Sequence, residues 1–228
     1  MYEFILLLFL GFLIYLQNFM YTYGTLLLEQ LFINDCNYIN NFSNYKKKYI
    51  VKNICKSILL FLILLITINP FINGFVYGIW SNLTFHICGC LYTAIDLGGL
   101  IYVKGLPKAT IIHHITTTII GILNIFTNYE IDGYYKSFLI YCFFSIIPFV
   151  VNFYLGARYI INDNLLKKKI AKVSYIVYGL SLFLNILCEI ILFFTNMFSY
   201  SIFFYITIFI MILNDDIILI KFLKKESE

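Results

Sequence analysis

The chain has 228 residues, of which 61% are hydrophobic and only 12% are charged, and its formal net charge is +4. Soluble domains typically have about 45–50% apolar and about 25% charged residues, so this composition excludes a soluble globular protein. The positive charge does not indicate nucleic-acid binding, because the lysines lie mostly in short segments between apolar stretches. Apolar stretches of roughly 18 or more residues are long enough to cross a bilayer. The composition therefore predicts an all-α integral membrane protein.

The apolar stretches predict about seven transmembrane helices. In chain order they are Phe4–Leu28, Tyr49–Ile68, Phe75–Val103, Ala109–Thr127, Tyr134–Gly156, Ile170–Phe194 and Ser199–Lys221. The first lacks a basic leader and a following cleavage site, so we interpret it as a membrane helix rather than a signal peptide. The predicted organisation is a first helix with a cytoplasmic loop (1–44), a six-helix membrane domain (45–225) and a short cytoplasmic tail (226–228).

The basic residues predict the orientation of these helices. With seven spans, loops one, three and five lie on the same side as the C-terminus, and that side carries every Lys and Arg except Lys136. Cytoplasmic loops are enriched in Lys and Arg. We therefore expect the N-terminus outside or in a lumen and the C-terminus in the cytoplasm. Lys52 and Lys56 lie within the predicted second span, near its start, and we assign them to the basic cytoplasmic side.

Polar residues inside the apolar stretches indicate a candidate site, because ionisable groups in a membrane usually face a bundle interior or a cavity. Asp96 ends a polar stripe along the third stretch, and His113 and His114 lie together near the start of the fourth. A short basic loop joins the two stretches, so we expect Asp96 and the histidines to face each other across an antiparallel hairpin. His86, the third histidine of the chain, is expected toward the opposite side of the membrane.

Asp96, His113 and His114 are the candidate catalytic residues. A neutral imidazole can accept a proton from an attacking amine or alcohol, and a nearby carboxylate can orient the ring and stabilise its cation. The alternative is that the histidines are polar pins that hydrogen-bond neighbouring helices. We expect no metal, because adjacent histidines on a helix diverge by about 100° and no third ligand has diagnostic spacing. No cofactor is expected, and acyl-CoA would be a substrate if the protein is an enzyme.

The segment "LYTAIDLGGLIYVKGLPKATIIHHITTTIIG", residues 91–121, resembles the core of the TLC family of membrane proteins. That family includes ceramide synthases, translocating-chain-associated membrane proteins and smaller TLC-domain proteins. The resemblance rests on Tyr92-x-x-x-Asp96, the basic loop and the histidine pair, with looser similarity in "FSIIPFVVNFYL" and "LNDDIILIKFLKK". It implies an endoplasmic-reticulum-type membrane and a role in lipid metabolism or membrane lipid homeostasis.

The smaller TLC-domain proteins are the closest in pattern, because the paired aspartates of ceramide synthases have no counterpart in "SFLIYCFFSIIPFV". The expected function is therefore to bind a membrane lipid in a polar cavity near the cytoplasmic leaflet. Besides the candidate catalytic residues, the residues expected to line this cavity are Tyr92, Thr93, Thr117, Asn152, Asn214 and Asp215.

Alternative functions remain open at this point. The first is a lipid acyltransferase of the ceramide-synthase type that uses the histidine pair as base. A fatty-acid elongase is a further alternative, although Thr110 stands where the first histidine of its HxxHH motif would be. A seven-helix receptor is another, because its topology would agree. The sequence leaves open whether the chain forms a homo-oligomer.

Overall fold

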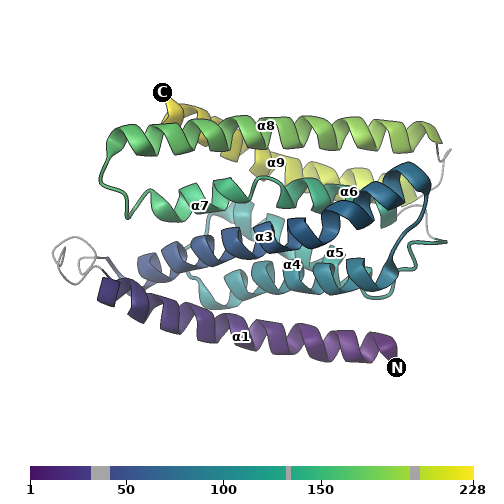
Figure 1. Ribbon diagram of the computed structural model, residues 1–228, viewed down its shortest axis with the longest axis horizontal. Helices are drawn as coiled ribbons and strands as arrows, with labels where there is room; N and C mark the ends of the chain where they lie inside the picture. The colour runs from purple at the N-terminus through teal and green to yellow at the C-terminus, as the bar shows by residue number, and fades with distance from the viewer. Residues whose placement is uncertain (32–41, 132–134, 196–200) are drawn as a thin grey trace.

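The computed structural model describes residues 1–31, 42–131, 135–195 and 201–228, and every regular element within these ranges is an α-helix. The predicted all-α class is confirmed for this part of the chain. In order the helices are α1 (Tyr2–Leu31), α3 (Asn44–Tyr77), α4 (Asn82–Tyr102), α5 (Lys108–Asn124), α6 (Tyr135–Ile146), α7 (Phe149–Ala157), α8 (Asn164–Thr195) and α9 (Ser201–Ser227) (Figure 1). Tyr134 and Ser199, at which two spans were predicted to begin, lie outside the described residues.

Four of the described helices are long and apolar enough to cross a membrane. They are α1, α3, α4 and residues Asn164–Ile191 of α8, and the bent pair α6–α7 would make a fifth if it forms one span. Seven spans were predicted. The count of seven is not confirmed for the described residues, in which α5 is only 17 residues long. The helices are compatible with an integral membrane protein.

The distribution of side chains is inverted relative to that of a soluble protein. Large apolar side chains are exposed along the outer helices, among them Phe12, Tyr15, Leu62, Leu65 and Phe183. Polar and charged side chains are buried between the helices, among them Lys52, Lys56, Asp96, His114 and Asp216. A contiguous apolar exterior indicates contact with a membrane or a partner, whereas buried charges require polar partners inside the bundle.

The boundary between the second and third predicted spans differs from the prediction. The second span was predicted to end at Ile68, before Pro70, but α3 continues through this proline to Tyr77. It ends at Gly78, whose φ of 73° is in the left-handed region that glycine adopts most readily. The predicted third span began at Phe75 and therefore ran across this break, since α4 begins only at Asn82.

The predicted fifth span is broken. Helices α6 and α7 are separated by residues 147–148 and are bent by 43° relative to each other. Pro148 lies directly before α7. Because proline lacks a backbone N–H and its ring clashes with the preceding turn, it interrupts a continuous helix. After the bend, α7 packs against α3 and α8.

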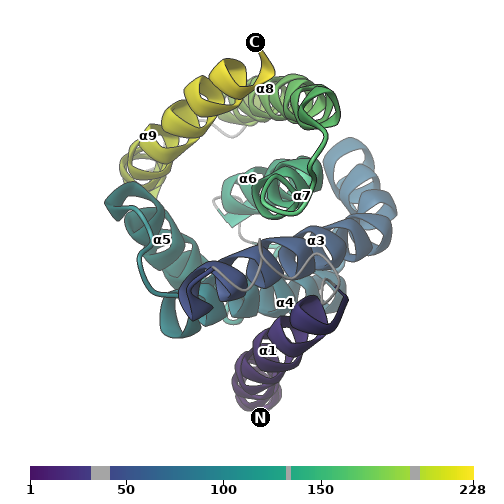
Figure 2. The same cartoon turned by 90° about the vertical axis from the view of Figure 1, so that its left-hand side faces the viewer.

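Six helical segments close a ring of neighbours around an interior cavity. Helix α3 packs against α4, α4 against α5, α5 against α9, and α9 against α8. The bent pair α6–α7 contacts both α8 and α3 and so links the two ends of this series, while α1 lies outside it against α4 and α3 (Figure 2). In this order α9 stands opposite α3. Residues from these two distant helices can therefore approach one cavity from opposite sides.

One end of the bundle gathers the basic segments. The starts of α3 and α8, the connection between α4 and α5, and the C-terminus of α9 lie together, at the left of Figure 1. Lys136 belongs to the start of α6, at the other end. Successive helices therefore run in opposite directions along the bundle. This arrangement places the basic segments at one end, as the charge pattern predicted, and it does not depend on which end faces the cytoplasm.

Candidate functional site

Helices α4 and α5 cross closely because glycines make room for polar side chains of the partner helix. A Cβ atom on Gly121 of α5 would overlap Thr93 Oγ1 of α4, and one on Gly89 of α4 would overlap Asn124 Nδ2 of α5. Only a residue without a side chain fits at such a crossing. The crossing fixes the register in which Asp96, further along α4, meets the first turns of α5.

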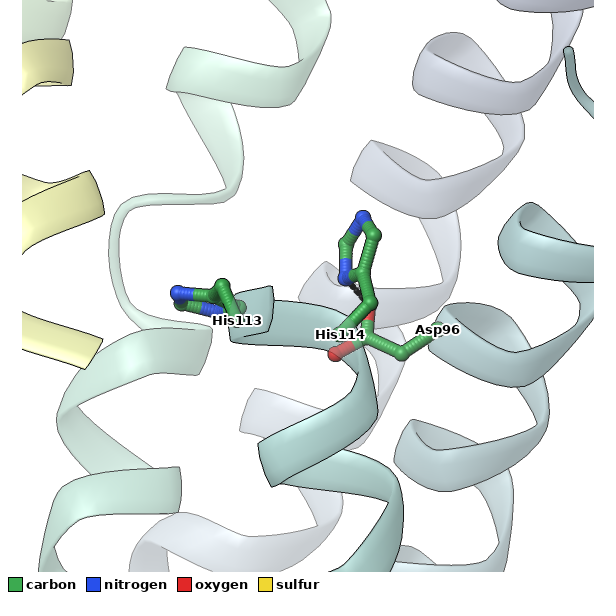
Figure 3. Close-up of side chains that lie close together, drawn as sticks. All are labelled: Asp96, His113 and His114. Atoms are coloured by element: carbon green, nitrogen blue, oxygen red, sulfur yellow. Dashed lines mark ion pairs between the residues drawn. The ribbon is translucent and has the colours of Figure 1, made fainter. Parts of the chain in front are cut away.

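Asp96 is completely buried, at 0% exposure, and is the centre of a polar cluster. Its Oδ1 accepts a hydrogen bond from Lys56 Nζ at 2.5 Å and lies 3.1 Å from His114 Nδ1 (Figure 3). Its Oδ2 accepts a hydrogen bond from Thr117 Oγ1 at 2.7 Å. A buried carboxylate is tolerated when it is paired and hydrogen-bonded, and Lys56 supplies the opposite charge. The predicted proximity of Asp96 and the histidines is confirmed.

Lys52 and Lys56 belong to this cluster, although the sequence interpretation counted them with the basic cytoplasmic side. Both are on α3, one turn apart, and they are only 3% and 8% exposed. Gly99 leaves room for Lys52, because a Cβ there would lie 2.8 Å from Lys52 Cε. Their spacing of four residues within the predicted second span, Tyr49–Ile68, is the signal that could have identified them.

The contacts of His114 favour one tautomer of its ring. Lys52 Nζ lies 3.2 Å from His114 Nε2. A lysine ammonium group can only donate, so the Nε2 atom accepts and the ring proton of a neutral imidazole is on Nδ1, beside Asp96. Nδ1 lies within ion-pair distance of the carboxylate but has no hydrogen bond of good geometry. Buried charges on two helices therefore hold this ring in place.

The His113 ring points away from His114 and lies close to two other carboxylates, both on α9. Its Nδ1 lies 3.5 Å from Asp215 Oδ2 and 4.0 Å from Asp216 Oδ1. Asp215 also accepts a hydrogen bond from Thr110 Oγ1 at 3.2 Å, and Asp216 accepts one from Tyr178 OH at 2.6 Å. Asp216 was not among the predicted site residues. Its 3% exposure and its position in the cavity wall make it part of the site.

A cavity of about 380 Å³ lies inside the ring between α3, α5, α7, α8 and α9. Thr93 and Thr117 line a separate, smaller cavity of about 50 Å³ between α4, α5 and α6, and Tyr92 lines both. Asn214 lines neither of these two cavities and is exposed on α9, contrary to the prediction. The predicted site residues that do line the larger cavity are Tyr92, His113, His114, Asn152 and Asp215.

The wall of the larger cavity carries polar atoms whose hydrogen bonds are incomplete. Arg158 Nε and Asn185 Oδ1 are buried and have no hydrogen-bond partner among the described residues, and His113 Nδ1 has only its 3.5 Å contact with Asp215 and a longer one with Asp216. Arg158 does donate from its terminal nitrogen to Tyr159 OH at 2.9 Å. Buried polar groups are normally satisfied, so several incomplete ones around one cavity indicate that a polar ligand or water completes them.

Side-chain atoms of Asp96, His113 and His114 come within 4.8 Å of one another, a separation that could hold a metal ion. The prediction of no metal rested on the divergence of adjacent histidines, yet their ring centroids are only 5.6 Å apart. Lys56 Nζ, however, is 2.5 Å from Asp96 Oδ1. A cation at this carboxylate would have to displace the ammonium group, so we interpret the cluster as an ion-pair cluster.

His86 has a structural role elsewhere in the bundle. Its Nδ1 lies 3.2 Å from Tyr2 OH of α1, and its Nε2 lies 2.8 Å from the carbonyl oxygen of Thr127. It therefore joins α4 to α1 and to the end of α5. His86 lines neither cavity, which agrees with its predicted separation from the histidine pair.

No protein-family model, curated protein or solved structure matches this chain. Its function is therefore argued from the cavity and the residues around it.

Proposed function

We propose that the chain is a multi-pass membrane protein of lipid metabolism or membrane lipid homeostasis that binds a lipid in its larger cavity. The observation that carries this proposal is a cavity of about 380 Å³ with a charged wall, inside a bundle whose exterior is apolar. Ligand-binding cavities are typically about 300–1,000 Å³, with a few convergent polar groups. A lipid is the ligand class that reaches such a cavity from a bilayer.

The cavity lies toward the basic end of the bundle. Leu106 and Pro107, from the connection between α4 and α5, form part of its wall, as does Arg158 at the end of α7. With basic segments on the cytoplasmic side, the proposed orientation is N-out and C-in, and the bound headgroup lies near the cytoplasmic leaflet. The TLC-like segment around Asp96 and the histidine pair is the basis for proposing an endoplasmic-reticulum-type membrane.

Lipid retention by the purified chain tests this proposal. The chain is extracted in mild detergent, separated from lipid micelles, and its retained lipid is measured by mass spectrometry. We expect a stoichiometric lipid in the wild type and a reduced amount in His113→Ala, whose ring forms part of the cavity wall. His86→Ala is the matched control, because that histidine lies outside the cavity. Retention no greater than that of an unrelated membrane protein would refute the proposal.

Acyl transfer is the second candidate, favoured by the position of His113 between the cavity and the α9 carboxylates. Asp215 lies 3.5 Å from one ring nitrogen, which leaves the other to accept a proton from a lipid amine or alcohol as it attacks an acyl-CoA thioester. The carbon–sulfur bond then breaks, and the imidazolium returns the proton to the departing thiolate. The products are an amide or ester and free coenzyme A.

An acyltransferase assay separates the two candidates. Purified chain is given acyl-CoA with lipid amines or alcohols, and new lipid and free coenzyme A are measured together. Loss of a general base typically lowers a rate about 10²–10⁴-fold, so His113→Ala should abolish both products in parallel. A lipid binder forms neither product. Activity that persists in His113→Ala would remove this residue from the catalytic role.

A further inference from the structure

We infer that the larger cavity selects a zwitterionic phospholipid headgroup, with the phosphate at the α3–α7 wall and the ammonium group at the α9 wall. This inference rests on the proposed function, because it assigns the chemical class of the lipid bound in that cavity. It is carried by charges that stand on different sides of the cavity without fixed opposite charges beside them.

The α3–α7 wall presents cations. Lys52 and Arg158 both line the cavity, and within the described part of the chain neither forms an ion pair with a carboxylate. Lys52 contacts His114 Nε2. Arg158 donates to Tyr159 OH and lies over the rings of Tyr159 and Phe222, but its Nε has no hydrogen-bond partner among the described residues. Lys56 is already paired with Asp96. A buried cation without a counter-ion is costly, so an anionic group of the ligand is the natural partner of Lys52 and Arg158.

The α9 wall presents the opposite charge. Asp215 and Asp216 are adjacent in sequence and line the same cavity. Among the described residues, neither forms an ion pair with a lysine or arginine, and their nearest basic group is His113, which is a cation only when protonated. Two neighbouring carboxylates attract a cation. A purely anionic lipid would leave the negative charge of these two carboxylates without a counter-charge, and the carboxylates would repel it.

Lys52 of the cationic wall lies across the ring from the acidic wall, whereas the guanidinium carbon of Arg158 lies 4.8 Å from the centre of the Phe222 ring of α9. Helix α9 stands opposite α3 in the order of packed helices (Figure 2). Asn152 and Tyr178 also line the cavity and add neutral hydrogen-bonding groups between them. A headgroup that carries both a phosphate and an ammonium group matches both walls at once. Phosphocholine and phosphoethanolamine headgroups share this chemistry, and the exposed apolar exterior places their acyl chains in the bilayer.

A competition experiment tests the inference. The purified full chain is incubated with mixed micelles that contain equimolar phosphatidylcholine, phosphatidylethanolamine, phosphatidylglycerol and diacylglycerol with identical acyl chains. The four lipids retained by the protein are then quantified in one sample. We expect the two zwitterionic lipids to be enriched roughly tenfold or more over the other two, the size expected from hydrogen bonds to charged groups.

Charge-neutral variants of each wall give opposite outcomes. Asp215→Asn combined with Asp216→Asn removes the acidic wall, so retention should shift toward the anionic phosphatidylglycerol. Lys52→Gln combined with Arg158→Gln removes the cationic wall, so the enrichment over diacylglycerol should be lost. Lys104→Gln, at an exposed lysine outside the cavity, is the matched control and should retain the wild-type order. Ratios within one sample do not depend on how much protein is folded.

Each contrary result has a defined meaning. Equal retention of phosphatidylglycerol and phosphatidylcholine by the wild type would overturn the headgroup assignment but not the proposed function. The same conclusion would follow if the wall variants lowered the retained amounts of all four lipids in the same proportion. Failure to retain any lipid would overturn the proposed function itself. Displacement of bound lipid by soluble glycerophosphocholine at the same concentration would overturn the assignment to a lipid and indicate a soluble zwitterion.

Discussion

His113 and His114 are neighbours in the sequence, yet their rings stand at 88° to each other and face carboxylates on different helices. His114 lies 3.1 Å from Asp96 of α4, whereas His113 lies 3.5 Å from Asp215 of α9. One ring is therefore built into the ion-pair cluster that joins α3, α4 and α5. The His113 ring has 13% of its side chain exposed and lines the larger cavity, where a ligand can contact it.

This division predicts different effects of alanine at the two histidines. His114→Ala should destabilise the fold by about 1–3 kcal/mol, because it leaves the buried Lys52 without its nearest partner. His113→Ala should change stability little but lower lipid retention. Denaturant unfolding and retained lipid are measured on the same preparations. Equal loss of stability in both variants would contradict the division.

The pair of Lys56 and Asp96 predicts a compensating double variant. Asp96→Asn alone should destabilise the protein by about 3–5 kcal/mol, because it leaves a buried ammonium group unpaired. Lys56→Met combined with Asp96→Asn removes both charges and should recover part of that loss. Unfolding free energies from a double-mutant cycle measure the coupling. Losses that simply add would show that the two groups do not interact.

The crossing of α4 and α5 predicts a steric effect at Gly121. Gly121→Ala should destabilise the protein, because the new Cβ would overlap Thr93 Oγ1. Thr93→Ala removes that atom and should restore part of the loss in the double variant. Gly11→Ala is the matched control, since nothing lies within 4 Å of its Cβ position. In a helix that change should be neutral or stabilising by roughly 0.5–1 kcal/mol, which thermal unfolding detects.

The charge pattern predicts the topology. In sealed microsomes whose cytoplasmic face is outward, added protease should remove a C-terminal tag and leave an N-terminal tag intact until detergent is added. The reason is that the basic segments lie at the end of the bundle that holds the C-terminus. Cleavage of both tags in intact vesicles would indicate an even number of spans.

The sequence by itself determined the class of the protein and one contact of the site. Composition required helices with an apolar exterior, and a short loop between two polar-striped stretches required Asp96 to meet the histidine pair. Both conclusions follow from local information, because periodicity shows which face of a helix is polar and a short connection shows which helix lies beside it.

Only the tertiary structure decided which distant helices complete the site. Lys52 and Lys56 were counted with the basic cytoplasmic side, but the packing of α3 places them on His114 and Asp96. Asp215 and Asp216 join His113 because α9 packs against α5, although about a hundred residues separate them in the sequence. Helical periodicity gives the direction of a side chain but not its partner. A buried charge can pair with any opposite charge that the bundle brings near, so the pairing is fixed only when the ring of helices closes.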